Sequence, residues 1–264
     1  MENQRKTALI TGGTSGIGKE LAKLFANDGY NLILVARTQS DLDSTADELR
    51  TLGVEVTTIA KDLSKMEEAR SLCQEVTQHV DVLVNDAGQG VYGLFKDNDI
   101  ERELEIIHLN ICGLVILTKH FVQQMLSLGD GKVLNVGSIA GKVPGPWQAV
   151  YHATKAFVLS FTSAIREEMA DSGITFTALL PGVTDTDFFN KAGMNESKAI
   201  QDKDAMANPA DVAKDGYDAL MAGEDRVTSG FKNKVQVTAS NLMPDAALAH
   251  QMNEQQKPVQ QENH

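Results

Sequence analysis

A tyrosine and a lysine four residues apart have the types and spacing of an acid–base pair in this chain of 264 residues. In Tyr151-His152-Ala153-Thr154-Lys155 the phenol and the ammonium group face the same side of a predicted helix. The unperturbed pKa of a phenol, about 10, is too high for acid–base work at neutral pH. A fixed ammonium group nearby favours the phenolate and lowers that pKa toward the working range. A tyrosine and a lysine at this spacing usually lie on the protein surface when no other motif accompanies them. The neighbouring motifs therefore decide whether this pair is catalytic.

A serine at the end of a predicted strand belongs to the same candidate site. Gly137-Ser138-Ile139-Ala140-Gly141 follows the predicted strand Val133–Val136. Ser138 is therefore expected at the carboxyl edge of a sheet, where open α/β folds bind ligands. Together with a glycine-rich turn upstream, Ser138, Tyr151 and Lys155 predict a catalytic site and not a surface pair.

The glycine-rich turn is Thr11-Gly12-Gly13-Thr14-Ser15-Gly16-Ile17-Gly18, between a predicted strand at Thr7–Ile10 and a predicted helix at Lys19–Asn27. So tight a turn needs positive φ and close backbone approach, which glycine allows. The helix N-terminus then presents free N–H groups to a pyrophosphate. The glycine spacing, G-x3-G-x-G, differs from the dinucleotide fingerprint G-x-G-x-x-G. The prediction of a pyrophosphate site therefore depends on where the turn lies, between the first predicted strand and the first predicted helix.

The residue after the second predicted strand, Asn31–Ala36, indicates which nicotinamide cofactor is bound. An acidic residue there is typical of NAD binding, but this chain has Arg37, and the nearest acid is Asp41. Arg37 can pair with a 2′-phosphate, and Thr14 and Ser15 can add hydroxyl contacts. Such charged hydrogen bonds contribute roughly 1.5–3 kcal/mol each, or about tenfold in affinity. We therefore predict NADP(H) in preference to NAD(H); the alternative is an Arg37 that is merely solvated.

The elements that position these residues alternate between short apolar runs and longer amphipathic segments. Nearly continuous apolar runs are typical of strands buried on both faces of a parallel sheet. The alternation predicts one α/β domain of Rossmann type, a doubly wound parallel sheet of about seven strands with helices on both faces. The predicted strands are Thr7–Ile10, Asn31–Ala36, Val54–Ala60, Val82–Val84, Val133–Val136 and Thr175–Leu180.

Two segments depart from this alternation. Residues 184–206 are polar and poorly periodic, so we expect a long substrate-side loop after a strand end. Residues 250–264 contain five Gln and almost nothing apolar. We expect the domain to span residues 1–249 and residues 250–264 to be a flexible polar tail.

Composition excludes several classes of protein. Hydrophobic residues make up 42% and charged residues 23% of the chain, which excludes disorder as its main state. A net charge of −12 without a cluster of basic residues argues against a nucleic-acid partner. Cys73 and Cys112 lie in apolar helical patterns, and the histidines form no metal-binding pair, so we expect no metal. A polar start and no apolar run near the ~20 residues of a membrane span predict a cytoplasmic protein without a membrane contact.

These motifs together resemble those of the short-chain dehydrogenase/reductase family, over residues 5 to 245. They follow the family's order and spacing, which makes the combination specific. A narrower resemblance, to the bacterial DltE-like subgroup, rests on Gly230–Lys234 and on Leu242-Met243-Pro244. The matching stretches are Thr11–Gly18, Asp62-Leu63, Asn85-Asp86-Ala87-Gly88, Asn110, Ser138, Tyr151-x3-Lys155 and Pro181–Thr186.

The resemblance implies a role for each motif. Tyr151 would be the general acid for a carbonyl oxygen, and Lys155 would lower its pKa and bind the nicotinamide ribose. Ser138 would hydrogen-bond the substrate oxygen, and Asn110 would hold a proton-relay water. The implied catalytic residues are Asn110, Ser138, Tyr151 and Lys155. The expected cofactor-binding residues are Gly12, Thr14, Ser15, Gly16, Ile17, Gly18, Arg37, Asp62, Leu63, Asn85, Ala87, Gly88, Tyr151, Lys155, Pro181, Gly182, Val183, Thr184 and Thr186.

One position departs from the family pattern, and one neighbour of the tyrosine needs an interpretation. Where the family usually has Asn-Asn-Ala-Gly, this chain has Asp86 as the second residue; an ionised Asp accepts hydrogen bonds but cannot donate them. We expect a structural adjustment and retained activity. His152 lies beside Tyr151, but helix geometry points it away, so we expect a surface or interface histidine and not a proton shuttle.

The predicted function is an NADP(H)-dependent oxidoreductase acting on a carbonyl or alcohol substrate. Two alternatives stay open: a non-catalytic NADPH-sensing module, and epimerisation or dehydration at the same site. Three segments are expected to form the substrate wall: residues 89–95, 139–149 and 184–206. Their side chains favour an apolar or aromatic small-molecule substrate: Tyr92, Phe95, Val143, Pro144, Pro146, Trp147, Phe188, Phe189 and Met194.

The assembly is predicted from two helices. The predicted helices at residues 100–128 and 149–172 carry more apolar surface than one sheet face covers. In the resembled family these helices are the usual subunit interface. We therefore expect a homodimer or homotetramer.

Overall fold

The structure is a computed structural model that describes residues 5–202 and 206–259. It forms a seven-stranded sheet in the order β3-β2-β1-β4-β5-β6-β7, and every neighbouring pair is parallel. The strands are β1 (Thr7–Thr11), β2 (Asn31–Ala36), β3 (Val56–Ala60), β4 (Val82–Asn85), β5 (Gly131–Val136), β6 (Ile174–Leu180) and β7 (Arg226–Thr228). The predicted single α/β domain with a doubly wound sheet is confirmed, and all six predicted strands are present with shifts of one or two residues at some ends.

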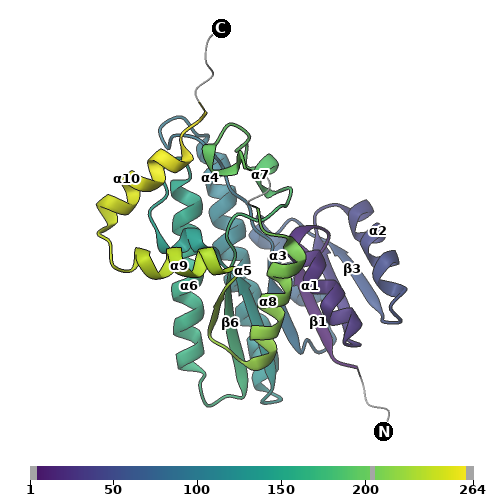
Figure 1. The fold of residues 1–264 in the computed structure, drawn as a ribbon. Coiled ribbons are helices and arrows are strands. Elements are labelled where there is room, and N and C mark those ends of the chain that lie inside the picture. Colours follow the sequence, from purple (N-terminus) through teal and green to yellow (C-terminus); the bar gives the residue numbers. More distant parts are fainter. Residues whose placement is uncertain (1–4, 203–205, 260–264) are drawn as a thin grey trace.

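Helices cover both faces of the sheet (Figure 1). The described helices are α1 (Gly16–Asn27), α2 (Gln39–Arg50), α3 (Met66–Glu75), α4 (Ile100–Ile107), α5 (Leu114–Leu126), α6 (Ala149–Glu168), α7 (Phe188–Lys191), α8 (Pro209–Ala222), α9 (Phe231–Ser240) and α10 (Asp245–Gln256). Three further helical segments are described besides these α-helices: the π-helical turn η1 (His108–Gly113) and the 3₁₀ turns η2 (Ile139–Lys142) and η3 (Lys198–Ile200).

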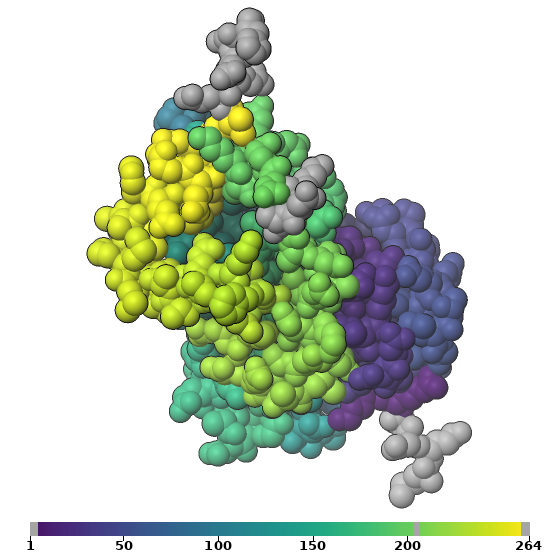
Figure 2. All heavy atoms as spheres, viewed as in Figure 1, coloured from purple at the N-terminus to yellow at the C-terminus, as the bar shows by residue number. Residues whose placement is uncertain are grey.

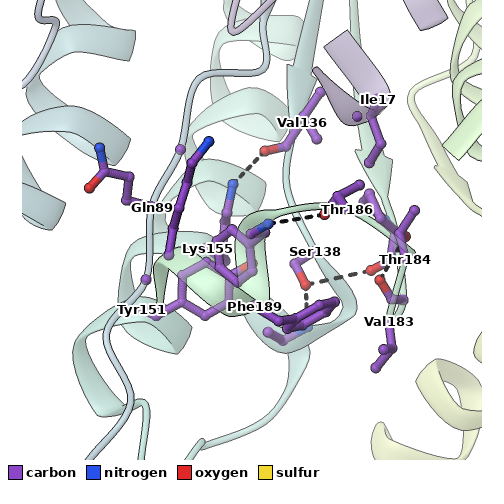
Figure 3. Close-up of a pocket in the computed structure, with 18 of the residues that line it drawn as sticks. Ile17, Gln89, Val136, Ser138, Tyr151, Lys155, Val183, Thr184, Thr186 and Phe189 are labelled. Atoms are coloured by element: carbon purple, nitrogen blue, oxygen red, sulfur yellow. Dashed lines mark hydrogen bonds between the residues drawn. The ribbon is translucent and has the colours of Figure 1, made fainter. Parts of the chain in front are cut away.

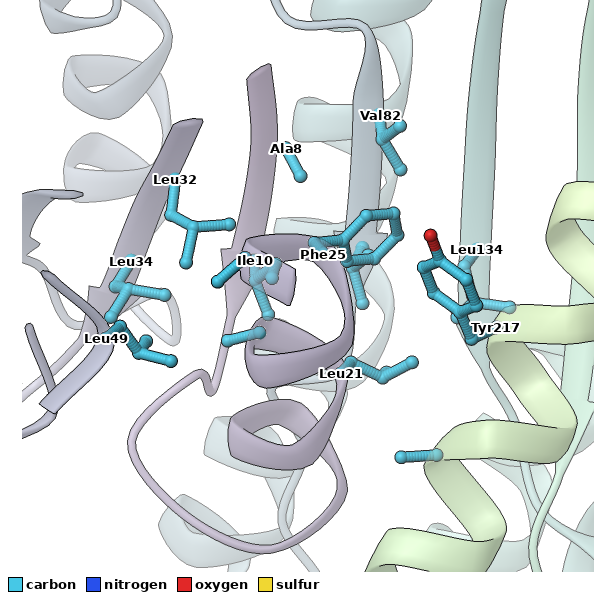
Figure 4. Packing of buried hydrophobic residues seen from close by; sticks show 14 of the residues in the cluster. Ala8, Ile10, Leu21, Phe25, Leu32, Leu34, Leu49, Val82, Leu134 and Tyr217 are labelled. Atoms are coloured by element: carbon cyan, nitrogen blue, oxygen red, sulfur yellow. The ribbon is translucent and has the colours of Figure 1, made fainter. Parts of the chain in front are cut away.

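Two hydrophobic clusters hold the layers together. On one face Phe25 of α1 is fully buried against the strands, and its ring centre lies 4.8 Å from the ring centre of Tyr217 of α8 (Figure 4). On the other face, Leu72, Phe121 and Ile165 from α3, α5 and α6 form the second cluster with the strands. Such continuous burial on both faces explains the unbroken apolar runs of the central strands.

One helical run, Ile100–Leu126, is long and apolar enough to cross a membrane, judged by length and composition alone. Half of its most apolar window is buried inside the fold. Core helices of soluble domains share this character, and here α5 packs on the sheet through Leu117, Phe121 and Met125.

The predicted flexible tail at residues 250–264 is wrong for its first part. Residues 250–256 belong to α10, which crosses the predicted boundary at residue 249. The helix end is held by buried hydrogen bonds of Gln256 and not by an apolar face, which is why hydrophobic patterning missed it. Residues 260–264 of that prediction lie outside the described part of the chain.

Candidate active site

The carboxyl ends of the six strands β1 to β6 and one face of α6 surround a cavity of about 1020 Å³. The strand order changes direction between β1 and β4, and ligands of such sheets bind at that point. The predicted site residues that line the cavity are Gly12, Thr14, Ser15, Gly16, Ile17, Arg37, Asp62, Leu63, Ala87, Gly88, Ser138, Tyr151, Lys155, Pro181, Gly182, Val183, Thr184 and Thr186. Gly18, Asn85 and Asn110 are not among the lining residues and lie behind this wall.

Tyr151 and Ser138 face each other in the cavity (Figure 3). Burial raises the pKa of the Tyr151 phenol to about 12, and the hydrogen bond with Ser138 opposes this rise. Ser138 is itself held in place, since its Oγ accepts from the Ala140 amide at 3.0 Å. The ring of Phe188 packs against Tyr151 with centres 5.1 Å apart. The phenol is therefore protonated at neutral pH, the state that a proton donor requires.

Lys155 is buried beneath the phenol and faces Asp86. Its Nζ lies 5.9 Å from the centre of the Tyr151 ring and donates to the Val136 carbonyl at 2.8 Å. Burial lowers the pKa of Lys155 to about 8, and the Asp86 carboxylate counteracts this. The expected lowering of the Tyr151 pKa by Lys155 is not what this geometry gives, because burial of the phenol is the larger effect.

Asp86 lies directly under the glycine-rich turn. A Cβ atom at Gly12 would lie 3.0 Å from Oδ2 of Asp86, and one at Gly18 only 2.5 Å from it. Burial raises the pKa of Asp86 to about 7, while Lys155 and the Gly18 amide lower it. A raised pKa favours the protonated carboxyl, which can donate a hydrogen bond as well as accept one. The residue pattern alone did not reveal this burial.

Asn110 lies in the π-helical turn between α4 and α5. Its side chain accepts from the Gln89 amide at 3.0 Å and donates to the Gln89 carbonyl at 2.9 Å and to Oγ1 of Thr154 at 3.0 Å. These bonds tie the loop after β4 to α6, one residue before Lys155. π turns inside α-helices frequently occur at functional sites.

Asn85, which is among the expected cofactor-binding residues, does not line the cavity. Its side chain is buried inside the sheet, where Nδ2 donates to Oγ1 of Thr118 and to Oδ1 of Asn135. Asn135 in turn donates to Oγ1 of Thr162. This network links β4, β5 and two helices, so Asn85 supports the sheet from behind the cavity.

The glycine-rich turn has the shape of a diphosphate cradle. Gly12 and Gly16 have φ angles of 72° and 52°. A Cβ atom at Gly16 would lie 2.8 Å from Thr186, so only glycine lets the two sides of the cavity approach this closely. The side chain of Ser15, the residue before α1, makes no capping hydrogen bond, although the Gly18 amide in the same first turn interacts with Asp86. These residues fit the diphosphate of a dinucleotide.

Arg37 is exposed at the end of β2 and lines the same cavity. It makes no hydrogen bond or ion pair with the residues that the structure describes, so its guanidinium group is available to a ligand. Asp62, across the cavity, is engaged locally, because its carboxylate accepts from the Ser64 hydroxyl at 2.7 Å.

Part of the predicted substrate wall lines the cavity and part does not. Val143, Phe188, Phe189 and Met194 line it. The predicted wall residues outside it are Tyr92, Phe95, Pro144, Pro146 and Trp147.

Residues near the C-terminus line the cavity without having been predicted. Met252, Gln255 and Gln256 of α10 reach it, as does Asn233 of α9. His152 was expected at the surface or in an interface, but it is buried at 4% exposure between α6 and α10. No sequence signal marked these contacts, because they depend on how the C-terminus folds back.

Comparison with known proteins identifies the family. The sequence pattern described as short chain dehydrogenase matches residues 6–197. The chain belongs to the short-chain dehydrogenase/reductase family. The uncharacterized oxidoreductase YmfI of Bacillus subtilis (strain 168) is 32% identical over 213 residues, covering 79% of this chain and 88% of YmfI.

Two solved structures extend the likeness over most of the chain. A short-chain dehydrogenase from Sphingobium yanoikuyae in complex with NADPH has a TM-score of 0.82 and 27% identity, covering 98% of this chain and 99% of its own. The bulky-bulky ketone specific alcohol dehydrogenase from Comamonas testosteroni has a TM-score of 0.77 and 26% identity, covering 90% and 93%.

This short-chain dehydrogenase/reductase is therefore an NAD(P)-dependent oxidoreductase that transfers hydride, and not a non-catalytic binding module. In such enzymes the nicotinamide cofactor supplies the redox chemistry, and the protein supplies orientation and electrostatics. The narrower resemblance to the DltE-like subgroup stays a prediction.

Proposed function

We propose that this enzyme reduces an apolar or aromatic ketone or aldehyde with NADPH, or oxidises the corresponding alcohol with NADP⁺. The observation that carries this proposal is the meeting of Tyr151, Ser138 and Lys155 in one cavity with a free Arg37. Epimerisation or dehydration would use the same groups, but no contact in the cavity favours either.

Each residue has a distinct part in the proposed reaction. NADPH, which the glycine-rich turn and Arg37 would hold, would supply a hydride to the carbonyl carbon. Tyr151 donates its phenolic proton to the carbonyl oxygen, and the alcohol product leaves Tyr151 as phenolate until it is reprotonated. Ser138 orients that oxygen, and the Lys155 ammonium stabilises the phenolate as it forms. Asn110 holds the loop and helix that place Lys155, in addition to its proposed role in proton supply.

Tyr151→Phe tests the proposed reaction. Loss of a general acid reduces turnover by about a hundredfold to ten-thousandfold, whereas the cofactor keeps its cradle. We expect turnover of acetophenone to fall by that amount while NADPH affinity, measured by fluorescence titration, stays within about twofold. Tyr30→Phe, distant from the cavity, is the matched control. Wild-type turnover rates in Tyr151→Phe would show that the proposed general acid is wrong.

Arg37 supports the proposed preference for NADP(H) over NAD(H). The group is exposed, lines the cavity and has no partner among the described residues. Its partner in the proposal is the 2′-phosphate of the adenosine ribose, which NADH lacks.

Titration of the wild type and of Arg37→Ala with both cofactors tests this preference. We expect NADPH to bind the wild type at least about tenfold more tightly than NADH, a difference of ~1.4 kcal/mol. Arg37→Ala should remove most of that difference and leave NADH affinity unchanged. Arg70→Ala, at another exposed arginine, is the control. Equal binding of the two cofactors by the wild type would refute the preference.

The apolar character proposed for the substrate rests on the side of the cavity opposite the glycine-rich turn. Val143, Phe188, Phe189 and Met194 form its apolar lining. Lys191, which also lines the cavity, is paired with Asp187 at 2.9 Å, so it is not a free partner for a carboxylate. The bulky ketone specificity named for the Comamonas testosteroni structure is consistent with this proposal. A substrate panel in which pyruvate outperforms acetophenone would contradict it.

Location and assembly belong to the same proposal. We propose a cytoplasmic enzyme that forms a homodimer or homotetramer through α4, α5 and α6. The exposed apolar side chains on these helices include Ile100, Leu104 and Phe157.

A further inference from the structure

The end of α10 is buried although its sequence is polar. Of the helix Asp245–Gln256, the buried residues are Leu248 and Gln256, and Gln256 is only 4% exposed. Burying an amide side chain costs free energy unless it is hydrogen-bonded. The contacts of Gln256 therefore indicate what holds this end of the chain in place.

The Gln256 side chain contacts the residue next to the proposed general acid. Its Nε2 lies 3.1 Å from Nε2 of His152, and Nδ1 of His152 lies 2.9 Å from the Val143 carbonyl oxygen. Because a carbonyl oxygen only accepts, Nδ1 carries the proton and Nε2 of the neutral ring accepts from the Gln256 amide. Burial lowers the pKa of His152, which favours this neutral form.

The backbone of Gln256 binds two further side chains. Its carbonyl oxygen accepts from the Tyr92 hydroxyl at 2.5 Å and from the Ser197 hydroxyl at 3.3 Å. The Tyr92 ring stacks on Trp147 with centres 5.6 Å apart, and Nε1 of Trp147 donates to Oδ1 of Asn253 at 3.0 Å. The last turn of α10 is thus fixed to two loops as well as to α6.

The loop before α6 is shaped around these contacts. Trp147 has a φ of 69°, a conformation that residues other than glycine rarely adopt. A Cβ atom at Gly145 would lie 2.1 Å from the imidazole of His152, so only glycine lets the loop pass over the ring.

The chain after α10 pairs with the connection that follows β6. The Lys198 amide donates to the Lys257 carbonyl at 3.1 Å, and the Val259 amide donates to the Glu196 carbonyl at 2.8 Å. Ser197 and Pro258 form an antiparallel bridge between them. Residues 192–201 and 253–259 are therefore joined by backbone hydrogen bonds.

The two joined segments close one side of the cavity. Met194 and Ile200 of the connection line it, and so does Gln256. In Figure 2 the yellow C-terminal residues and the green connection meet beside the recess.

We propose that residues 192–201 and 253–259 form a single lid over the substrate side of the cavity, and that the His152–Gln256 hydrogen bond locks this lid to α6. His152 and Gln256 are then positioning residues that fix the apolar wall relative to Tyr151. The family pattern ends at residue 197, so the C-terminal half of this lid lies outside it. The effect on turnover rests on the proposed reductase function, whereas the coupling of the two segments does not.

Amide hydrogen exchange of the full chain tests the coupling without a substrate. Gln256→Leu keeps the approximate size of the side chain and removes its donor. We expect exchange about three- to tenfold faster in both segments, the factor expected for one lost hydrogen bond. Gln251→Leu, at an exposed position of the same helix, should leave exchange unchanged. Faster exchange in residues 253–259 alone would overturn the single lid.

Two further variants test the lock itself. Asn253→Leu removes the Trp147 contact but keeps the His152 contact, and it should also speed exchange in both segments. His152→Phe and Gln256→Leu remove the two sides of one hydrogen bond, so their combined effect should be clearly smaller than the product of the single effects. If the double variant changes exchange by the full product of the two single effects, the His152–Gln256 hydrogen bond does not lock the lid. Thermal melts of each variant show whether it remains folded.

Kinetics with NADPH and two probe ketones, acetophenone and the larger benzophenone, test the positioning role. A loosened wall weakens binding of a large ketone without removing the general acid. We expect Gln256→Leu to raise KM for benzophenone about three- to tenfold, with kcat changed less than about twofold. An unchanged KM, or equal losses of kcat for both ketones, would refute this role. No wild-type turnover of any ketone would instead refute the proposed function and leave the exchange result valid.

Discussion

At the scale of single residues, the site combines a phenol, an ammonium group and a carboxyl group that are all shifted by burial. The pKa of Tyr151 is raised to about 12, and the pKa of Lys155 is lowered to about 8. Asp86 opposes the change at Lys155, and Lys155 opposes the change at Asp86. The Asp at this position therefore stabilises the charge on the proposed catalytic lysine, which an Asn cannot do.

The Asp86 carboxyl should make stability depend on pH. Burial raises its pKa from 3.8 to about 7, so the folded state binds more protons than the unfolded state between these values. Stability contributed by the protonated carboxyl is present below about pH 4 and is lost as pH rises toward 7. Because an Asn side chain does not ionise, Asp86→Asn should not lose this stability as the pH rises. We expect its melting temperature, relative to the wild type, to be higher at pH 8 than at pH 5.

Melting curves across this pH range check the Asp86 prediction. Asp211→Asn, an exposed carboxyl at the start of α8, should shift the melting temperature equally at every pH. The same pH-independent shift in Asp86→Asn would contradict the raised pKa.

At the scale of elements, the ends of strands and the starts of helices surround the cavity. The two segments of the proposed lid, residues 192–201 and 253–259, close one side of it. β1, β4, β5 and β6 end at one edge of the sheet, which brings the glycine-rich turn, Asp86, Ser138 and Thr184 together. The interactions that hold the proposed lid differ from those that hold the sheet. The α10 part of the lid gains little from apolar burial and is held by hydrogen bonds, and the other segment adds the small buried cluster of Ala192, Met194 and Ile200. The lid is therefore expected to open at lower free energy than the sheet, whose hydrophobic clusters are much larger.

The order of stability among elements follows from their packing. β1, β4 and β5 are buried under helices on both faces, whereas α9 exposes Phe231 and Val235. Amides of the central strands should therefore exchange only on global unfolding, and those of α9 and α10 through local opening. This ordering makes it possible to perturb the lid without unfolding the sheet.

At the scale of the whole molecule, exposed apolar side chains on α4 and α6 favour self-association. Ile100 is 57% exposed and Phe157 is 37% exposed, and Phe157 stacks on Phe161 with ring centres 5.7 Å apart. The net charge of −12 opposes non-specific association of the molecules through the rest of their surface. Closed symmetric pairing of these helices would bury the apolar groups.

Sedimentation at micromolar concentration checks the proposed assembly. We expect the mass of two or four chains for the wild type, and a shift toward monomer for Phe157→Asp because a buried charge opposes association. Leu242→Asp, at an exposed position in the turn after α9, is the control and should keep the wild-type mass. A wild-type monomer, or dissociation by the control alone, would show that the predicted interface is wrong.

Local sequence patterns were sufficient to predict the sheet and most of the residues that line the cavity. Hydrophobic periodicity and glycine spacing are local properties, so they located the strands, the turn at Thr11–Gly18 and the motifs with Ser138 and Tyr151. The parallel sheet then brings strand ends to one edge, which is why most predicted residues line one cavity.

The burial of individual polar groups, in contrast, became visible only in the folded chain. Asn85 proved to lie within the sheet, Asp86 under the glycine-rich turn, and His152 against the chain's own C-terminus. The pKa of a group depends on everything packed around it, and a polar helix such as α10 is fixed by partners more than a hundred residues away in sequence. No local pattern records such contacts, because they are formed only when distant segments fold together.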